Sequence, residues 1–433
     1  MDRNDGLLTL CAALVASATF SPAHAASPTV EERLEALEAG YAQLKAENAR
    51  LRERLAAQAP DAAPVAVTAA TSATSAAPAA APPVPTDADR PAAIIAAGKE
   101  TKLTIGGFIQ GQYENGDAGD ERFVGINDRF FFRRARLSVT GRFAENFDFR
   151  VEADFGANSL GASTGIRASA NEIYVNWNRY PAANLRVGYL KPAFGGDQLW
   201  SDTTTHTIER PLASDRIADG RQPGFGVYGS FLGQRLGYIV TAGHGNGSGS
   251  SQNDDDRFLG AARLYGTLFD SPAAGRLVGA VNVLHSNDSA SLKPGFGFDA
   301  IPGGPADGIF RGKRSGWGAD AQWSLGRAYL GGELLRERFE PDNALPFRAF
   351  DAQGWQLTAA YMLVPHRLQA VLRREVFDPN LDVAGDATEN WLAGLNYLVK
   401  GDDIKLMVNY LFGDAPGLPD DSGRLLARVQ LVY

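Results

Sequence analysis

The sequence has 433 residues, a formal net charge of −8 and 10% aromatic residues. This composition excludes both a basic nucleic-acid-binding surface and a disordered acidic tail. Because the sequence contains no run of 18 or more apolar residues, no transmembrane helix is expected in the mature chain.

Residues 1–25 are predicted to be a cleaved signal peptide. An apolar stretch from Leu7 to Phe20 precedes Ala23-His24-Ala25, which has the A-x-A form of a cleavage site. The only cysteine of the sequence, Cys11, lies in this segment. The mature chain is therefore expected to have no disulfide or thiol chemistry.

Residues 26–56 are predicted to form a coiled-coil helix. Apolar residues recur there at alternating spacings of three and four, with the polar Asn48 at one a position of the heptad. A single amphipathic helix that lies on another surface is the alternative. Residues 57–100, rich in Ala and Pro, are predicted to be a disordered linker, because they have too few large apolar groups to offset the entropy of ordering.

Residues 101–433 are predicted to be all-β. In the segment 129–155, Leu137 and Val139 alternate with Arg136 and Ser138, and the period of two resumes after a three-residue connection. Successive side chains of a strand point to opposite faces, so each strand would have one apolar and one charged face. A soluble β-sandwich would give the same alternation, so this hairpin alone does not identify what surrounds the apolar face.

The lengths of the connections distinguish the two architectures. About sixteen segments share the period of two, and short connections such as 144–146 and 326–327 alternate with long polar ones such as 194–223 and 287–313. An even number of antiparallel strands with short turns at one end and long loops at the other is typical of outer-membrane barrels. We therefore predict a transmembrane antiparallel β-barrel of about 16 strands, with its apolar face against outer-membrane lipid.

The charged face of such a barrel would line a water-filled channel, since side chains do not fill a barrel of this size. Arginine stays charged and offers a planar fork to carboxylate and phosphate oxygens, so inward arginines would favour anions. Mutual pairing of arginines and acids on the wall is the alternative role. The predicted pore-lining residues are Arg134, Arg136, Arg142, Arg150, Arg186, Asp148, Glu152 and Asp154.

The connection 194–223 is the candidate constriction of this channel. Its partly apolar composition would allow it to fold back into the lumen, where acids and bases together would create a field across the channel. An external loop that packs on a neighbouring molecule is the alternative. The predicted constriction residues are Glu209, Arg210, Asp215, Arg216 and Arg221.

Three segments carry a family resemblance. "RRARLSVTGRF", "LRVGYLKPAF" and "ERPLAS" occur in this order and resemble early-barrel segments of the phosphate-selective porin O and P family. The resemblance implies a sixteen-stranded homotrimer with an inward-folded third extracellular loop and an anion-favouring pore, and it places Glu209, Arg210 and Ser214 on that loop. Known members concentrate lysines for phosphate, whereas 101–433 contains only six lysines, so the choice between phosphate and other anions stays open.

The predicted function is passive diffusion of small anionic solutes, such as phosphate, through a porin in the bacterial outer membrane, with the coiled coil in the periplasm. A tether to peptidoglycan through the coiled coil and a general non-selective porin are the alternatives. No nucleic-acid partner, catalytic residue, metal site or cofactor is predicted. The four histidines of the mature chain lie in or near separate connections, no G-x-S-x-G occurs, and the acidic run 254–256 is interpreted as a solvated loop tip.

Overall fold

The computed structural model describes the barrel and only a small part of the N-terminal region. The chain divides into two compact units, 1–74 and 75–433. The predicted signal peptide, the predicted coiled coil apart from Arg50, and most of the predicted linker lie outside the described residues. The described residues are 50, 93–96, 102–156, 168–247, 252–289, 292–297, 307–342, 348–419 and 422–433.

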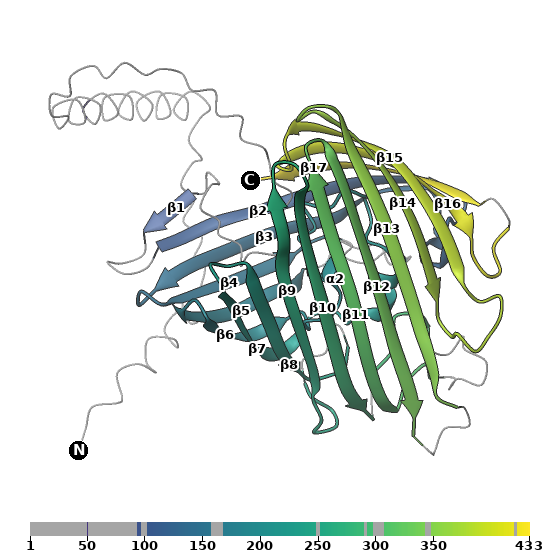
Figure 1. Cartoon of the computed structure of the whole chain (residues 1–433), viewed down its shortest axis with the longest axis horizontal. Coiled ribbons are helices and arrows are strands. Elements are labelled where there is room, and N and C mark those ends of the chain that lie inside the picture. Colours follow the sequence, from purple (N-terminus) through teal and green to yellow (C-terminus); the bar gives the residue numbers. More distant parts are fainter. Residues whose placement is uncertain are drawn as a thin grey trace, which may run out of the picture. The chain divides into compact units, whose positions relative to one another are not determined.

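Sixteen antiparallel strands, β2 to β17, close into a barrel (Figure 1). Each strand pairs with the next one along the chain, and β17 pairs back with β2. The predicted all-β barrel is thereby confirmed. The strands are β2 Lys102–Gly116, β3 Arg129–Phe143, β4 Phe147–Asp154, β5 Ser169–Tyr180, β6 Ala183–Leu190, β7 Gln222–Phe231, β8 Leu236–Gly243, β9 Leu259–Ser271, β10 Gly275–Asp288, β11 Gly312–Leu325, β12 Ala328–Pro341, β13 Phe350–Val364, β14 Leu368–Asp378, β15 Thr388–Lys400, β16 Ile404–Asp414 and β17 Gly423–Val432.

A short additional strand, β1 (Ala93–Ala96), precedes the barrel and pairs antiparallel with the start of β2, from Lys102 to Ile105. It lies inside the range predicted to be a linker, where the composition gives no sign of a strand. β17 pairs with β2 only from Phe108 onward. β1 therefore covers the part of the β2 edge that β17 does not reach, where backbone groups would otherwise be unpaired.

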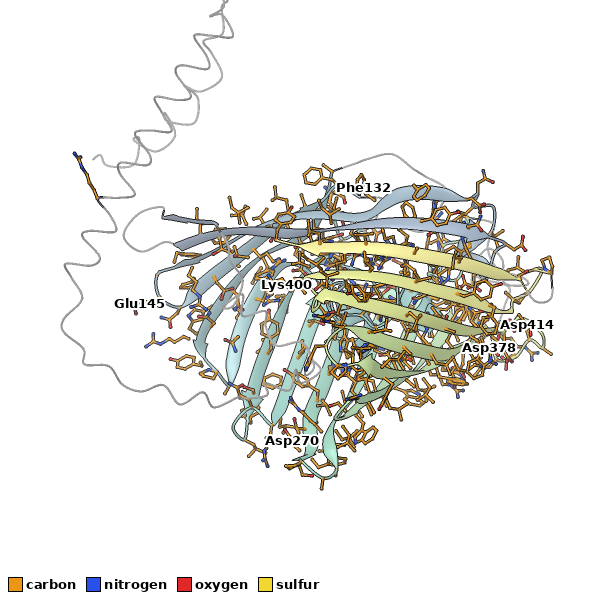
Figure 2. The ribbon with its side chains drawn as sticks, turned by 90° about the horizontal axis from the view of Figure 1, so that it is seen from above. Phe132, Glu145, Asp270, Asp378, Lys400 and Asp414 are labelled. Atoms are coloured by element: carbon orange, nitrogen blue, oxygen red, sulfur yellow. The ribbon has the colours of Figure 1, made fainter. Side chains whose placement is uncertain are left out.

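The two faces of the barrel have the opposite polarity to those of a soluble β-protein. On β13, Gln356 and Thr358 are buried, whereas Trp355, Leu357 and Tyr361 on the other face are exposed. Side chains project from both faces of the barrel wall (Figure 2). A continuous exposed apolar face is stable only in an apolar solvent, so the outer face meets lipid hydrocarbon and the polar face lines the interior.

The connections differ in length between the two ends of the barrel. At one end, the turn 144–146 joins β3 to β4, and the C-terminal Tyr433 exchanges two 3.0 Å backbone hydrogen bonds with Gly107. At the other end, connections such as 191–221 are long. Glu145 marks the short-turn end and Asp414 the long-loop end in Figure 2. In outer-membrane barrels the short turns face the periplasm.

Short helical segments occur in two of the long connections. The β6–β7 connection contains α2 (Gly196–Leu199) and α3 (Leu212–Ile217), and the β2–β3 connection contains the 3-10 turn η2 (Glu121–Phe123). In the described part of the chain, no helix combines the length and the apolar composition that crossing a membrane requires.

Candidate functional site: the loop inside the barrel

The connection between β6 and β7, residues 191–221, lies inside the barrel, and we call it the lumen loop. Its backbone contacts inward-facing side chains of the opposite wall: the Ile208 N–H donates to Asn409 of β16 (2.7 Å), and the Leu212 N–H donates to Glu375 of β14 (2.9 Å). A segment that starts and ends at β6 and β7 can reach these strands only by crossing the lumen. The alternative of an external loop packed on a neighbouring molecule does not fit these contacts.

Apolar residues of the lumen loop explain why it packs against the wall. Ile208 is buried in a cluster with Met407, Leu411 and Leu426. A second cluster joins Phe194, Leu212 and Ile217 of the loop to Leu335 and Phe377 of β12 and β14. These side chains would be exposed to the aqueous lumen if the loop were outside, so burying them stabilises the folded-in position.

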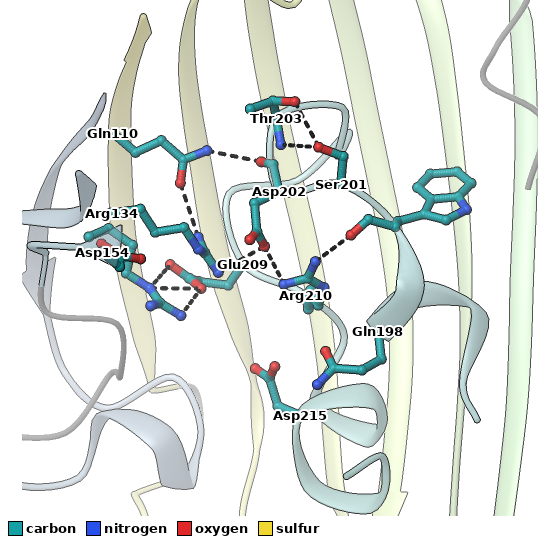
Figure 3. Close-up of polar contacts among 12 residues, drawn as sticks. Gln110, Arg134, Asp154, Gln198, Ser201, Asp202, Thr203, Glu209, Arg210 and Asp215 are labelled. Carbon is teal, nitrogen blue, oxygen red and sulfur yellow. Dashed lines mark hydrogen bonds and ion pairs between the residues drawn. The ribbon is translucent and has the colours of Figure 1, made fainter. Parts of the chain in front are cut away.

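One carboxylate, Asp202, is the central ion-pair partner of the loop. It lies 3.1 Å from a nitrogen of Arg134 and 2.7 Å from a nitrogen of Arg136, both on β3. It also pairs with Arg210 of the loop (Figure 3). Burial alone would raise the pKa of Asp202, but Arg134, Arg210 and Arg136 hold it well below its usual value. Asp202 is therefore charged at neutral pH and fixes the loop to β3.

A second carboxylate, Glu209, extends this ion-pair network. It contacts Arg133 of β3 at 3.1 Å and Arg428 of β17 at 2.6 Å, and it accepts a hydrogen bond from Gln112 of β2. Burial opposes ionisation, yet Arg133, Arg428 and Arg134 keep the pKa of Glu209 below its usual value. The loop is thus bound to three neighbouring strands through one side chain.

Basic side chains of the wall also bind backbone carbonyls of the loop. Arg373 of β14 donates to the Thr207 hydroxyl (2.7 Å) and to the Glu209 carbonyl (2.8 Å). Lys405 of β16 donates to the Thr205 carbonyl at 3.0 Å. These bonds satisfy carbonyls that an irregular buried segment cannot pair within itself.

The C-terminal half of the loop is fixed from the β2–β3 connection. Arg122 pairs with Asp120 at 2.7 Å and with Asp215 of α3 at 2.9 Å. Arg216 of α3 pairs with Glu121 at 3.2 Å. Both connections belong to the long-loop end of the barrel, so η2 and α3 hold each other at that mouth.

Helix α2 packs on an acidic part of the wall. The Gly196 N–H donates to Glu333 of β12, and Gln356 of β13 donates to Asp197 at 3.0 Å. Burial raises the pKa of Asp197 above its usual value. A Cβ at Gly196 would lie 2.7 Å from the carboxyl carbon of Asp320 on β11, so any other residue would require a shift of this carboxyl group or of α2.

The wall formed by β4, β5, β6 and β7, which we call the open wall, has a different arrangement. Arg150 contacts Glu152 at 2.5 Å and Glu172 at 3.3 Å, and Arg221 contacts Glu172 at 3.1 Å. Arg186, in contrast, lies over the aromatic rings of Tyr174 and Tyr228. This wall therefore combines a paired group of charges with one arginine held by π-faces.

The structure brings together many, but not all, of the residues predicted from the sequence. Arg134, Arg136, Glu152 and Asp154 form one network, since Arg136 also contacts Asp154 at 2.8 Å and Glu152 at 3.8 Å. Others lie apart from it. Arg142 is exposed at the short-turn end, Asp148 accepts from Asn176 and Asn178, Arg221 pairs with the open wall, and Ser214 is buried on α3.

Several residues of the network were missed by sequence reasoning. Arg133 is buried beside Arg134 because a bulge leaves it unpaired in the β2–β3 register, where Gln110 pairs with Arg134 and Gly111 with Phe132. A strict period of two cannot show such a bulge. Other missed residues are Asp202, Arg373, Glu375 and Arg428, each of which has at least one partner that is distant in the sequence.

Comparisons with known proteins agree with this architecture. Residues 103–268 match the model of the phosphate-selective porin O and P family. Porin O of Pseudomonas aeruginosa is 22% identical over 306 residues, which cover 65% of this chain and 68% of that protein. Two solved structures share the fold. The anion-selective porin from Comamonas acidovorans has a TM-score of 0.52 at 13% identity, covering 77% of this chain and 100% of that one. In-vitro folded OmpT of Vibrio cholerae, in its trimer form, has a TM-score of 0.50 at 11% identity, covering 77% and 100%.

Proposed function

We propose that this chain, whose residues 103–268 match the model of the phosphate-selective porin O and P family, is an outer-membrane porin that conducts small anions, phosphate among them, by passive diffusion. The lumen loop is the constriction of the channel. In support, the loop crosses the lumen and is fixed to the wall by Asp202 and Glu209. Family and fold are those of a channel rather than an enzyme.

The anion preference rests on how the charges of the lumen are paired. The carboxylates Glu152, Glu172, Asp202 and Glu209 each contact at least one arginine, so their negative charge is locally compensated. Arg186 has no carboxylate within ion-pair distance among the residues that the structure describes. On the open wall, Asp148 is hydrogen-bonded to two side-chain amides, whereas the Arg186 guanidinium has no ion-pair partner among the described residues, so we assign the anion preference to Arg186.

A planar-bilayer measurement tests this proposal directly. Purified protein is inserted under a KCl gradient, and the zero-current potential is measured before and after inorganic phosphate is added to both sides. We expect a potential of the sign that chloride selectivity gives, and a reduced chloride current when phosphate is present. A cation-selective potential, or protein that forms no channel, contradicts the proposed function.

We also assign a homotrimer to this protein, with the contact on the outer face of β2, β3, β16 and β17. A mostly apolar groove of about 830 Å³ lies there. Phe130, whose side chain is 82% exposed, and Phe132 border the groove, while Gly111 contributes no side chain to it. Exposed aromatic residues around a hollow suit the packing of a second copy of the chain.

Filling the groove tests the assigned interface. Gly111→Trp places a ring in the groove and is expected to shift the protein from trimer to monomer in native mass measurements in detergent. Nothing lies within 4 Å of a Cβ at this position, so the barrel itself can accept the ring. Gly260→Trp is the matched control, since a Cβ at Gly260 also has nothing within 4 Å and Gly260 lies on β9, outside the assigned contact. Unchanged trimers in Gly111→Trp would refute this interface.

A further inference from the structure

Arg186 of β6 is held between two tyrosines of the neighbouring strands. Its guanidinium carbon lies 3.9 Å from the ring centroid of Tyr174 on β5 and 4.7 Å from that of Tyr228 on β7. In the strand register, Arg186 faces Asn176 on one side and Gly226 on the other. A Cβ at Gly226 would lie 3.3 Å from the Tyr228 ring, so the glycine allows this ring to lie where it contacts the guanidinium.

The carboxylates near Arg186 are occupied by other groups. Asp148 accepts hydrogen bonds from Asn176 at 3.1 Å and from Asn178 at 2.7 Å. Glu172 contacts Arg150 and Arg221. The surroundings of Arg186 therefore hold its position through ring faces without neutralising its charge, since a cation–π contact leaves the N–H groups at the edge unused.

One whole edge of the Arg186 guanidinium has no acceptor. Its Nε and Nη2 atoms are covered and have no hydrogen-bond partner within the described part of the chain, whereas each of the other covered arginines there has at most one such nitrogen. The Tyr228 hydroxyl on the same wall is also without a partner. Covered donors without acceptors are costly and commonly mark the place of an unseen water or ion.

We propose that Arg186 is a binding site for the carboxylate group of permeating solutes, an inference that rests on the proposed anion channel. Nε–H and Nη2–H point the same way and match the two coplanar oxygens of a carboxylate. One guanidinium compensates the single charge of a carboxylate, whereas it compensates only part of the charge of a phosphate dianion. Because the two nitrogens are covered, a carboxylate reaches them only when neighbouring atoms move aside.

Block of the chloride current by small anions tests this site. The chloride conductance of single channels is titrated with sodium acetate and, separately, with inorganic phosphate at neutral pH. We expect acetate to half-block at a lower concentration than phosphate in the wild-type protein. Arg186→Gln should raise the acetate concentration for half-block about tenfold, as the loss of one charge-assisted bidentate contact implies. Arg235→Gln, the same change at an exposed turn position, should leave the titration unchanged.

Three further variants separate the effect of the planar fork from that of the charge, and the effect of the ring from that of the hydroxyl. Arg186→Lys keeps the positive charge, so the zero-current potential should be retained while acetate block is lost. Tyr174→Phe keeps the ring face and should behave like the wild type, whereas Tyr174→Leu removes it and should weaken acetate block about threefold.

The possible failures can be told apart. A chloride-selective channel whose acetate block is the same in Arg186→Gln and in the wild type overturns the carboxylate site alone. Phosphate block that is tighter than acetate block and depends on Arg186 overturns the choice of carboxylate. Wild-type protein that forms no channel, or a cation-selective one, overturns the proposed function together with this inference.

Discussion

The lumen loop and the open wall use arginine in two different ways. At the loop, Arg134 and Arg136 are buried against Asp202, so their charges fix a segment in place. On the open wall, Arg186 is fixed by Tyr174 and Tyr228, so its charge is not cancelled. Arginine content alone therefore does not predict selectivity, because an ion-paired arginine serves structure and an unpaired one acts on the solute.

Of the changes that test this contrast, loss of Asp202 should have the largest effect, because it acts on the position of the lumen loop. Asp202→Asn removes the carboxylate that Arg134, Arg136 and Arg210 share, and only Arg136 keeps other acidic partners among the described residues, so the loop position should be destabilised by about 3–5 kcal/mol. We expect a larger single-channel conductance and faster hydrogen exchange in the loop. Asp307→Asn is the control, because the Asp307–Arg311 pair is solvent-exposed. Equal conductance of the Asp202 variant and the wild type would show that the loop is held by other contacts.

Acidification should release the same part of the loop. The pKa of Asp202 and that of Glu209 are lower in the folded protein than in the unfolded chain. Their contribution to stability is therefore fully present above the unfolded values of about 4 and is lost as the pH falls toward the folded values. Hydrogen exchange of residues 202–209 should accelerate relative to strand amides below about pH 4.

Helix α2 should respond to pH in the opposite direction. The pKa of Asp197 is raised by burial, so its contribution is fully present below the unfolded value and is lost as the pH rises through the raised value. Relative to strand amides, exchange at Gly196–Leu199 should therefore be slowest in mildly acidic solution and accelerate toward higher pH. The same pH dependence in both parts of the loop would contradict their assigned charges.

A smaller effect is expected from Gly196→Ala. The new Cβ would lie 2.7 Å from the carboxyl carbon of Asp320 on β11, so α2 or this carboxyl group must shift, at a cost of about 1–3 kcal/mol. Faster exchange confined to α2, with unchanged selectivity, is the expected outcome. Gly260→Ala, where nothing lies within 4 Å, serves as the comparison. Exchange as slow as in the wild type would show that the contact is not tight.

Period-two alternation was sufficient to predict the sixteen barrel strands, because the polarity of each face is a local property of the sequence. The same alternation could not show the Arg133 bulge, since one inserted residue changes the face without changing the composition. β1 was missed because its four Ala and Ile residues lie in an Ala-rich segment. Asp202 was missed because the period-two pattern gives no information on side chains in a connection. The partners of such a side chain depend on the path of the connection inside the barrel.

The contrast between paired and unpaired arginines is tested most directly by the zero-current potential of Arg186→Gln in a KCl gradient, measured beside the wild type and Arg235→Gln. The account predicts a potential shifted away from chloride selectivity in Arg186→Gln alone, with single-channel conductance that shows the loop still in place. A potential equal to that of the wild type would contradict it, because the selectivity would then come from the ion-paired arginines of the loop.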